Sequence, residues 1–324
     1  PASTINTGDI YISHIASDGN WWTGISLLNT TASALTVTIA FDNGATRTRE
    51  LAAREHQAFF IQDLFGGTPQ PGIDSAVITG GSGVIGLELF GSGNMLSGIL
   101  LKDDTTTEIY YPHIHSDTAW WTGVVAYNPS PASCDITVTP YTAAGVSLAP
   151  LDDDISAGGK YVGTVADLDL PAGTAWFRIE AANPITGFEL FGTTNENQLA
   201  GYTGVGISGA DGVFAKIEKA GWTGIAFVNT EATPATVNLT AYDDSGTVVD
   251  TKDITLNAHA KELGFAEDIF DGDISGATYI TYSADKVLVG FQLNGSTDGM
   301  MLDGLPALIG PETGPIVCSY SIYP

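Results

Sequence analysis

Apolar residues alternate with small polar residues over short runs along the chain, which is the periodicity of β-strands with one wet face. The segments 36–41, 136–141 and 237–242 show it clearly, with Thr or Asn at polar positions. Gly, Asp and Asn, which favour tight turns, separate such runs. The composition agrees, because Gly, Thr, Ala, Val and Ile are abundant and Lys, Arg, Glu and Met are scarce. The pattern predicts an all-β fold without long helices.

Two short motifs recur at nearly constant spacing. The first, Trp-Thr-Gly, returns after 99 and 101 residues and begins at Trp22, Trp121 and Trp222. The second is Gly-x-Glu-Leu-Phe-Gly at 86–91 and 187–192, which becomes Gly-Phe-Gln-Leu-Asn-Gly at 290–295. Two independent markers that stay in register predict three tandem copies of one unit.

The same elements follow the Trp-Thr-Gly motif in each copy. An apolar segment that ends in Asn comes first, at 25–29, 124–128 and 225–229. Because it is apolar on both faces, we expect a central strand covered on each side. The closing Asn is expected to bond to the backbone two residues on and begin a turn. Tight hairpin turns are expected at Gly44, Gly145 and Gly246.

The second half of each copy begins at a basic position, which is His56, Lys160 or Lys261. An Asp follows seven residues later, at Asp63, Asp167 and Asp268, and predicts a single helical turn capped by a carboxylate. Two further strands are expected, the second formed by the Gly-x-Glu-Leu-Phe-Gly motif. About seven short strands per unit fit an antiparallel sandwich better than a four-stranded propeller blade.

We therefore predict three tandem antiparallel β-sandwich repeats of the immunoglobulin-like type. Their expected ranges are 1–108 with an N-terminal extension, 109–211 and 212–308. Residues 309–324 are expected to form a strand-like tail, where a fourth opening strand would stand. The predicted assembly residues of this tail are Ile316, Val317, Tyr320, Ile322 and Tyr323.

The order of these elements resembles the tandem β-sandwich repeats of secreted or surface proteins of environmental bacteria. The resemblance covers about residues 10–308. It implies the sandwich fold and an extracellular location. That family has no assigned reaction, so the resemblance implies no catalytic residue.

The formal net charge is −26, from 37 acidic and 11 basic residues. Nucleic acids and anionic lipids bind to clustered cations, so this charge argues against both as partners. A strongly acidic surface keeps a protein soluble and suits a secreted or cell-surface protein. No apolar run reaches about 18 residues, so no membrane span is predicted. The start at Pro1, without Met, is typical of a secreted protein after removal of its signal peptide, or of a shortened chain.

The chain has two cysteines, Cys134 and Cys318. Two cysteines cannot form a disulfide scaffold of the kind found in small secreted domains. One disulfide between the second repeat and the tail is possible in an oxidising compartment, and two buried free thiols fit the sequence equally well.

The repeats differ at positions that could bind a ligand. Trp21 and Trp120 correspond to Gly221, so we expect these two rings to be partly exposed and the Trp-Thr-Gly rings to lie in the core. An exposed Trp beside carboxylates could bind a sugar. The two candidate sets are Trp21, Asp18 and Glu88, and Trp120, Asp117 and Glu189. The alternative is a cross-strand hydrogen bond from His14 or His113 to the Glu, replaced by Lys216 and Gln292 in the third repeat.

Metal binding and catalysis have weaker support. His113 and His115, with Asp117 and Glu189, could hold zinc, but the first repeat has only His14. The acidic runs 152–154 and 268–273 could hold Ca²⁺, although neither matches the twelve-residue loop pattern. No nucleophile motif or paired carboxylate is evident. We therefore predict a protein that is not an enzyme and needs no cofactor, with Ca²⁺ as the one possible ion.

Taken together, these features predict a non-catalytic extracellular structural protein. Its expected role is that of a subunit of a filament, appendage or surface layer, assembled end to end from copies of itself. The alternative is a carbohydrate-binding or adhesin module that uses exposed Trp and carboxylates, with glycans as its partners.

Overall fold

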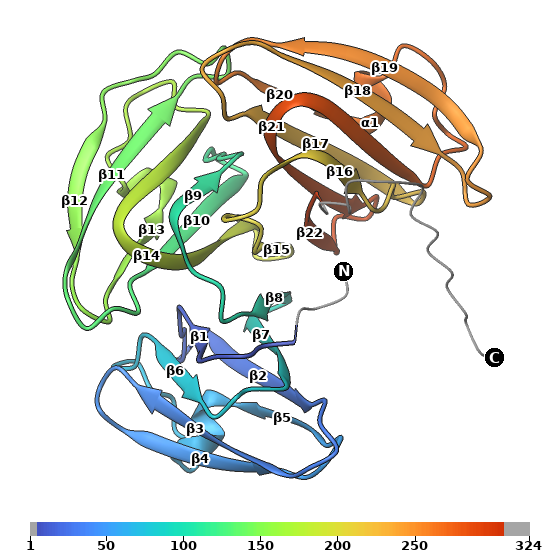
Figure 1. The fold of residues 1–324 in the computed structure, drawn as a ribbon. Helices are drawn as coiled ribbons and strands as arrows, with labels where there is room; N and C mark the ends of the chain where they lie inside the picture. Colours follow the sequence, from blue (N-terminus) through green and yellow to red (C-terminus); the bar gives the residue numbers. More distant parts are fainter. Residues whose placement is uncertain (1–4, 308–324) are drawn as a thin grey trace.

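The protein consists of three β-sandwiches joined in series, and the computed structural model describes residues 5–307 (Figure 1). Strands account for 54% of the residues and helices for 4%, so the predicted all-β class is confirmed. Neighbouring strands pair antiparallel in each repeat. None of the helices within residues 5–307 has the length and hydrophobicity needed to cross a membrane.

Repeat 1 is a sandwich of two four-stranded sheets, with strand orders β1-β6-β3-β4 and β5-β2-β7-β8. Aliphatic side chains from both sheets, including Ile25, Ile39 and Ile78, fill the space between them. Its elements are β1 (Ile10–Ile12), β2 (Trp22–Asn29), β3 (Leu35–Phe41), β4 (Thr46–Leu51), β5 (His56–Phe60), η1 (Ile61–Phe65), β6 (Ala76–Thr79), β7 (Val84–Ser92) and β8 (Met95–Leu101).

Repeats 2 and 3 have the same order of elements. The elements of repeat 2 are β9 (Thr106–Tyr111), β10 (Trp120–Tyr127), β11 (Cys134–Tyr141), β12 (Leu151–Ile155), β13 (Lys160–Thr164), η2 (Val165–Asp167), β14 (Trp176–Thr193) and β15 (Leu199–Tyr202). The elements of repeat 3 are β16 (Gly209–Phe214), β17 (Gly221–Asn229), β18 (Ala235–Tyr242), β19 (Val248–Leu256), β20 (Lys261–Phe265), α1 (Ala266–Ile269), β21 (Tyr279–Ser296) and β22 (Leu302–Pro306).

One long strand runs through both sheets in repeats 2 and 3, where the sequence predicts two separate strands. β14 and β21 each contain 18 residues and pair with β11 and β10, or with β18 and β17, at their two ends. In repeat 1 the same stretch is divided between β6 and β7. Gly80 and Gly83 interrupt it with φ of +75° and +86°, a conformation that glycine adopts easily and a strand cannot contain. The division is therefore a local effect of these glycines.

The predicted turns are present. Gly44, Gly145 and Gly246 have φ of +83°, +85° and +77° in their hairpins. The helical turns η1, η2 and α1 follow in each repeat. In η1 the Asp63 carboxylate accepts a hydrogen bond from the Phe60 backbone N–H at 2.9 Å, so this acid caps the helical turn as expected.

Asparagine closes the central strand of each repeat and organises the next turn, as predicted. The Oδ1 atoms of Asn29, Asn128 and Asn229 accept a hydrogen bond from the backbone N–H two residues on, at 2.9, 3.0 and 3.0 Å. Each Nδ2 also donates to three backbone carbonyls, and all three side chains are completely buried. An amide is needed because it both accepts and donates.

The Trp-Thr-Gly rings do not lie between the sheets, so the prediction that they fill the sandwich core is wrong. Ile25 and Leu27 of β2 point into the core, and the alternation of a strand therefore turns Trp22 outward. Its ring lies over Gly91, where a Cβ would come within 2.1 Å of it. Trp121 and Trp222 lie over Gly192 and Gly295 in the same way. The repeated motif builds the outer face of the sheet.

Candidate functional site: the junctions between repeats

The outer face of one repeat packs on the preceding repeat, and this contact is built twice. We call the receiving side the socket and the inserted side the plug. The socket residues are His14, Trp21, Glu88, Phe90 and Ile99 in repeat 1, and His113, Trp120, Glu189, Phe191 and Tyr202 in repeat 2. The plug residues are Trp121, Lys160, Phe188, Leu190 and Leu199 in repeat 2, and Trp222, Lys261, Phe291, Leu293 and Leu302 in repeat 3.

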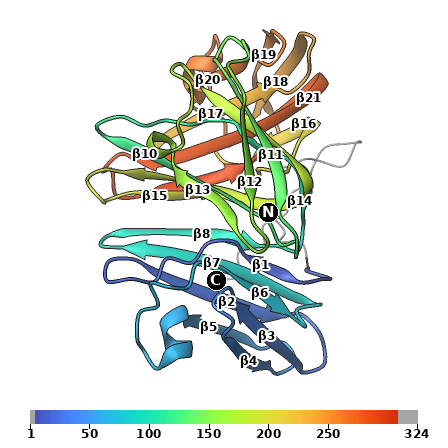
Figure 2. The ribbon, with the colours of Figure 1, turned by 90° about the vertical axis from the view of Figure 1, so that its left-hand side faces the viewer.

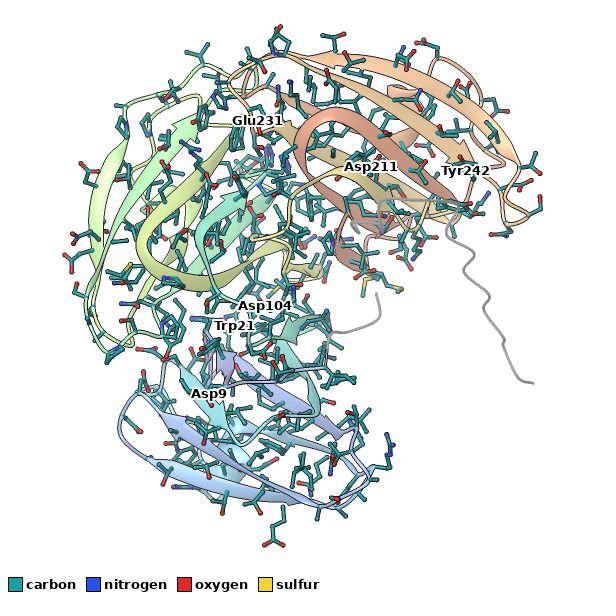
Figure 3. All side chains as sticks on the ribbon, in the orientation of Figure 1. Asp9, Trp21, Asp104, Asp211, Glu231 and Tyr242 are labelled. Carbon is teal, nitrogen blue, oxygen red and sulfur yellow. The ribbon has the colours of Figure 1, made fainter. Side chains whose placement is uncertain are left out.

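Aromatic rings form the apolar part of each junction. Phe90 and Phe188 lie 5.5 Å apart between ring centroids, and the equivalent pair, Phe191 and Phe291, lies 5.0 Å apart. The edge of Trp21 meets Trp121 at 6.5 Å, and Figure 3 places Trp21 at the boundary between repeats 1 and 2. Because the four phenylalanine rings are at most 2% exposed, the repeats are held by core-like packing.

The last strands of the three repeats approach one another closely at glycines. β15 lies directly above β8 in Figure 2 and also contacts β22. A Cβ on Gly201 would come within 2.6 Å of the Ile99 side chain, and one on Gly304 within 2.6 Å of the Gly201 carbonyl oxygen. Gly98, Gly201 and Gly304 are spaced by 103 residues. The junction therefore needs a residue without a side chain on the plug strand.

A lysine of the plug crosses each junction. Lys160 Nζ lies 2.8 Å from His14 Nδ1 and donates to the Asp74 carbonyl at 2.7 Å. One repeat later, Lys261 Nζ lies 3.2 Å from His113 Nδ1 and donates to the Ala175 carbonyl. For the ammonium group to donate to Nδ1, each histidine must carry its proton on Nε2. The junction thus contains the same polar bridge twice.

The charges beside this bridge are set by burial. Burial, with Lys160 or Lys261 adding to it, lowers the pKa of His14 and His113 to about 3, so both imidazoles are neutral at pH 7. Burial raises the pKa of Glu88 and Glu189 well above 4.5, against the opposing effect of the lysines. Burial also lowers the pKa of Lys261 to about 8. Burial thus favours the neutral form of the His and of the Glu in each cluster, and the lysine of the following repeat opposes this effect on the Glu.

The two glutamates form no hydrogen bond within residues 5–307. All four carboxyl oxygens of Glu88 and Glu189 are buried and unpaired, and neither residue has exposed surface. The cross-strand bond from His to Glu is therefore wrong, because the Lys of the next repeat is the partner of the His. In repeat 3, Gln292 instead donates to the Lys216 carbonyl at 2.7 Å.

The sugar-binding sets are not assembled as predicted. Trp21 and Trp120 are partly exposed, as expected, but they lie in the junctions. Asp18 and Asp117 accept hydrogen bonds from the backbone N–H groups of the turn that leads to each Trp, at 2.6 to 2.8 Å. Since the glutamates are completely buried, no sugar hydroxyl can reach them, and a surface site built on Glu88 or Glu189 is wrong.

The predicted metal ligands do not converge on one point, although the rings of His113 and His115 are stacked with centroids 6.3 Å apart. His115 is exposed and pairs with Asp117 at 3.1 Å, whereas His113 is turned to Lys261. Within residues 5–307, no three His, Cys, Asp or Glu side chains are close enough to share a metal ion. The acidic run 152–154 lies on the exposed edge strand β12.

Cys134 is completely buried in the core of repeat 2 and forms no disulfide with another residue of 5–307. Its sulfur accepts a hydrogen bond from the Asn183 N–H at 3.3 Å. Cys318 lies outside the described residues, as do the predicted assembly residues Ile316, Val317, Tyr320, Ile322 and Tyr323. The disulfide and the docking of the tail stay predictions.

Sequence reasoning missed the role of Lys160 and Lys261. The signal was present, because the basic position recurs in each repeat and the change from His to Lys in the socket occurs with the change from Glu to Gln. The sequence could not show that each lysine contacts the histidine of the preceding repeat.

The tight fit of Trp121 against Gly192 gives a testable difference between repeats. Gly192→Ala is expected to lower the free energy of unfolding by about 2 kcal/mol, because Trp121 is held by repeat 1 and cannot move aside. Gly91→Ala creates the same overlap with Trp22, whose ring can shift outward, and should cost less than about 1 kcal/mol. Urea unfolding of both variants checks this, and equal losses would contradict it.

The family profile for a "family of unknown function (DUF5719)" matches residues 98–262. No curated protein matches the chain. Among solved structures, one of a tetra-tandem repeat in the extending region of a large adhesion protein is similar over 94% of this chain and 74% of that chain, with 14% identity and a TM-score of 0.15.

A second similar structure is Bacteroides uniformis beta-glucuronidase 2, covalently bound to cyclophellitol-6-carboxylate aziridine. It covers 61% of this chain with 11% identity and a TM-score of 0.15. The chain spans only 31% of the length of that enzyme. Both TM-scores are too low to bear on the fold or function of this chain.

Proposed function

The chain belongs to the family of unknown function DUF5719, and from its junctions we propose that it is a non-catalytic structural protein of the cell exterior. Its role is that of a subunit of a filament, appendage or surface layer, which assembles end to end. The observation that carries this proposal is the plug-and-socket contact, built twice between different faces of successive repeats.

When two units join through two different faces, one plug and one socket remain uncovered. The same operation can be repeated, and it produces an open array unless the rotation returns to the start. The junction is also stiff, because aromatic packing, a buried lysine bridge and a glycine contact all fix the same orientation. A stiff, repeatable joint suits a load-bearing or spacing role.

The chemistry of the described residues gives less support to catalysis. A cavity of about 240 Å³ lies between repeats 1 and 2, and its charged lining residues are Lys102 and Asp104. No His, Cys or Glu lines it, so it has no Ser–His or Cys–His arrangement and no pair of carboxylates. Carbohydrate binding also loses support, because Trp21 and Trp120 are engaged in the junctions.

Electron microscopy of the purified 324-residue chain tests the proposal. We expect linear assemblies that lengthen when the salt concentration rises from about 0.05 to about 0.5 M, because screening reduces the repulsion between subunits of charge −26. A chain that stays monomeric in sedimentation at every salt concentration, and that binds to a glycan array, would contradict the structural role and favour the carbohydrate-binding alternative.

A further inference from the structure

Repeat 1 has a plug face that no other repeat within residues 5–307 covers. Strand pairing places Leu96, Leu199 and Leu302 at the same position, each opposite the glycine that lies under the Trp ring. Leu199 is 1% exposed and Leu302 is 9% exposed, because each packs on the preceding repeat. Leu96 is 57% exposed. The same leucine is thus buried by a junction in two repeats and free in the first.

The rest of this face is apolar as well. Phe60 packs edge-on against Trp22 at 5.0 Å and is 43% exposed, and Leu28 is 36% exposed. Leu87 and Leu89, which correspond to the buried plug residues Phe188 and Leu190, are partly exposed. An apolar face of this kind marks an interaction site.

Repeat 3 has the opposite half, a socket that no other repeat within residues 5–307 fills. Leu305 occupies the position of Ile99 and Tyr202, as its pairing with Gln292 shows. Ile99 and Tyr202 are buried by the next repeat, whereas Leu305 is partly exposed. The side chain of Lys216, which replaces the socket histidine, is 47% exposed.

The plug of repeat 1 and the socket of repeat 3 differ from those of the internal junctions in complementary ways. In both internal junctions the plug supplies Lys and the socket supplies His. In the uncovered plug and the uncovered socket this pair is inverted, because the plug of repeat 1 has His56 and the socket of repeat 3 has Lys216. A joint between copies would therefore again bring one lysine to one imidazole.

The socket of repeat 3 also contains unsatisfied polar atoms. Among the described residues, Gln292 Oε1 and Asn294 Nδ2 are buried without a hydrogen-bond partner. Gln292 Oε1 is an acceptor and Asn294 Nδ2 is a donor. An imidazole can serve both, whereas a lysine can only donate, so His56 suits this socket better than the lysine of the internal plugs.

From these observations we propose that the plug of repeat 1 docks in the socket of repeat 3 of a second copy, with His56 beside Lys216. This inference rests on the proposed function and identifies the surfaces of its joint. The partner is a second copy of this chain because the internal junctions supply the geometry and the inverted pair supplies the chemistry. The joint is expected to be weaker than the internal ones, since Asn294 takes the place of Phe90 and Phe191.

Two variants with equal changes test the surfaces. Leu96→Asp places a charge in the plug, and Val248→Asp places one on β19 at a residue with a similar exposure of 51%. We expect Leu96→Asp to reduce assembly in sedimentation at least tenfold and Val248→Asp to leave it unchanged. Both residues are exposed, so circular dichroism should show both variants folded.

Cross-linking tests the joint directly. His56→Cys and Lys216→Cys are combined with Cys318→Ser, and the full chain is treated with a short bis-maleimide. A ladder of covalent oligomers is expected, and the control pair Val248→Cys with Lys216→Cys should give none. Assemblies that persist in Leu96→Asp but disappear on deletion of residues 309–324 would overturn this inference and leave the structural function intact. Absence of both assembly and ladder would overturn both.

Discussion

Replacing Glu88 and Glu189 with glutamine is expected to stabilise the protein above pH 4.5, by at most about 1.4 kcal/mol for each carboxyl and each pH unit until the pH reaches the raised pKa of the folded carboxyl. Both carboxyls are buried and unpaired within residues 5–307, and burial raises their pKa well above 4.5. In the pH range just above 4.5 they stay protonated in the folded protein but ionise in the unfolded chain. Unfolding therefore releases protons, and stability falls as the pH rises.

The histidines act in the opposite direction. His14 and His113 have a pKa of about 3 in the folded protein, against 6.5 when unfolded. Unfolding takes up their protons below pH 6.5, so their contribution to stability rises with pH between about 3 and 6.5. Between pH 4.5 and 6.5 the two effects oppose each other within each junction. The natural protein should be most stable in this window, whereas the double glutamine variant should keep its stability above it.

Denaturant unfolding at pH 5, 7 and 8.5 measures this profile. Glu50→Gln is the matched control, because it removes an equal charge from an exposed position on β4 and should change stability little at any pH. Repeat 3 already has a glutamine, Gln292, at the position of Glu88 and Glu189. A double variant that is less stable than the natural protein at pH 8.5 would show that the carboxylates are ionised and paired with the lysines.

Removing one turn-forming asparagine should have a similarly large effect. Asn128→Ala is expected to lower the free energy of unfolding by at least about 3 kcal/mol. The change leaves three carbonyls, at Ala132, Ile155 and Ser156, without the Nδ2 donor, and the bond to Ile155 is buried. The Ser130 N–H also loses its acceptor. Urea unfolding followed by circular dichroism measures the loss.

Two further variants separate the amide from ordinary turn propensity. Asn43→Ala removes an exposed side chain that accepts one hydrogen bond, from the Ala45 N–H, and should cost less than about 1 kcal/mol. Asn128→Asp retains the acceptor but turns a carboxylate oxygen toward the three carbonyls, so it should be nearly as harmful as alanine. Full stability in Asn128→Asp would show that the donor bonds are not needed.

Local elements followed closely from local sequence. Hairpin glycines, the asparagine turn and the acid of the helical turn depend on residues within a few positions of one another, and each was predictable for this reason. The strand break at Gly80 and Gly83 belongs to the same class, although the sequence was interpreted as two strands in every repeat. Comparison of the three copies also showed that Trp21 and Trp120 are not core residues.

Two of the wrong predictions concerned the face of the sheet on which Trp22 lies and the surroundings of Glu88. Trp22 was placed in the core because a large invariant ring usually lies there, yet strand alternation turns it outward over Gly91. The sugar-site prediction needs Glu88 at the surface beside Trp21, but the next repeat covers it, and nothing in its own repeat indicates this cover.

The sequence by itself determined the number of repeats, their strands and their turns, because these depend on periodicity and on contacts a few residues apart. Only the tertiary structure decided that the face marked by Trp-Thr-Gly packs on the preceding repeat, and that Lys160 and Lys261 reach back to His14 and His113. The physical reason is distance along the chain. These partners are 146 and 148 residues apart, and their pairing depends on how whole repeats stack, which no local pattern encodes.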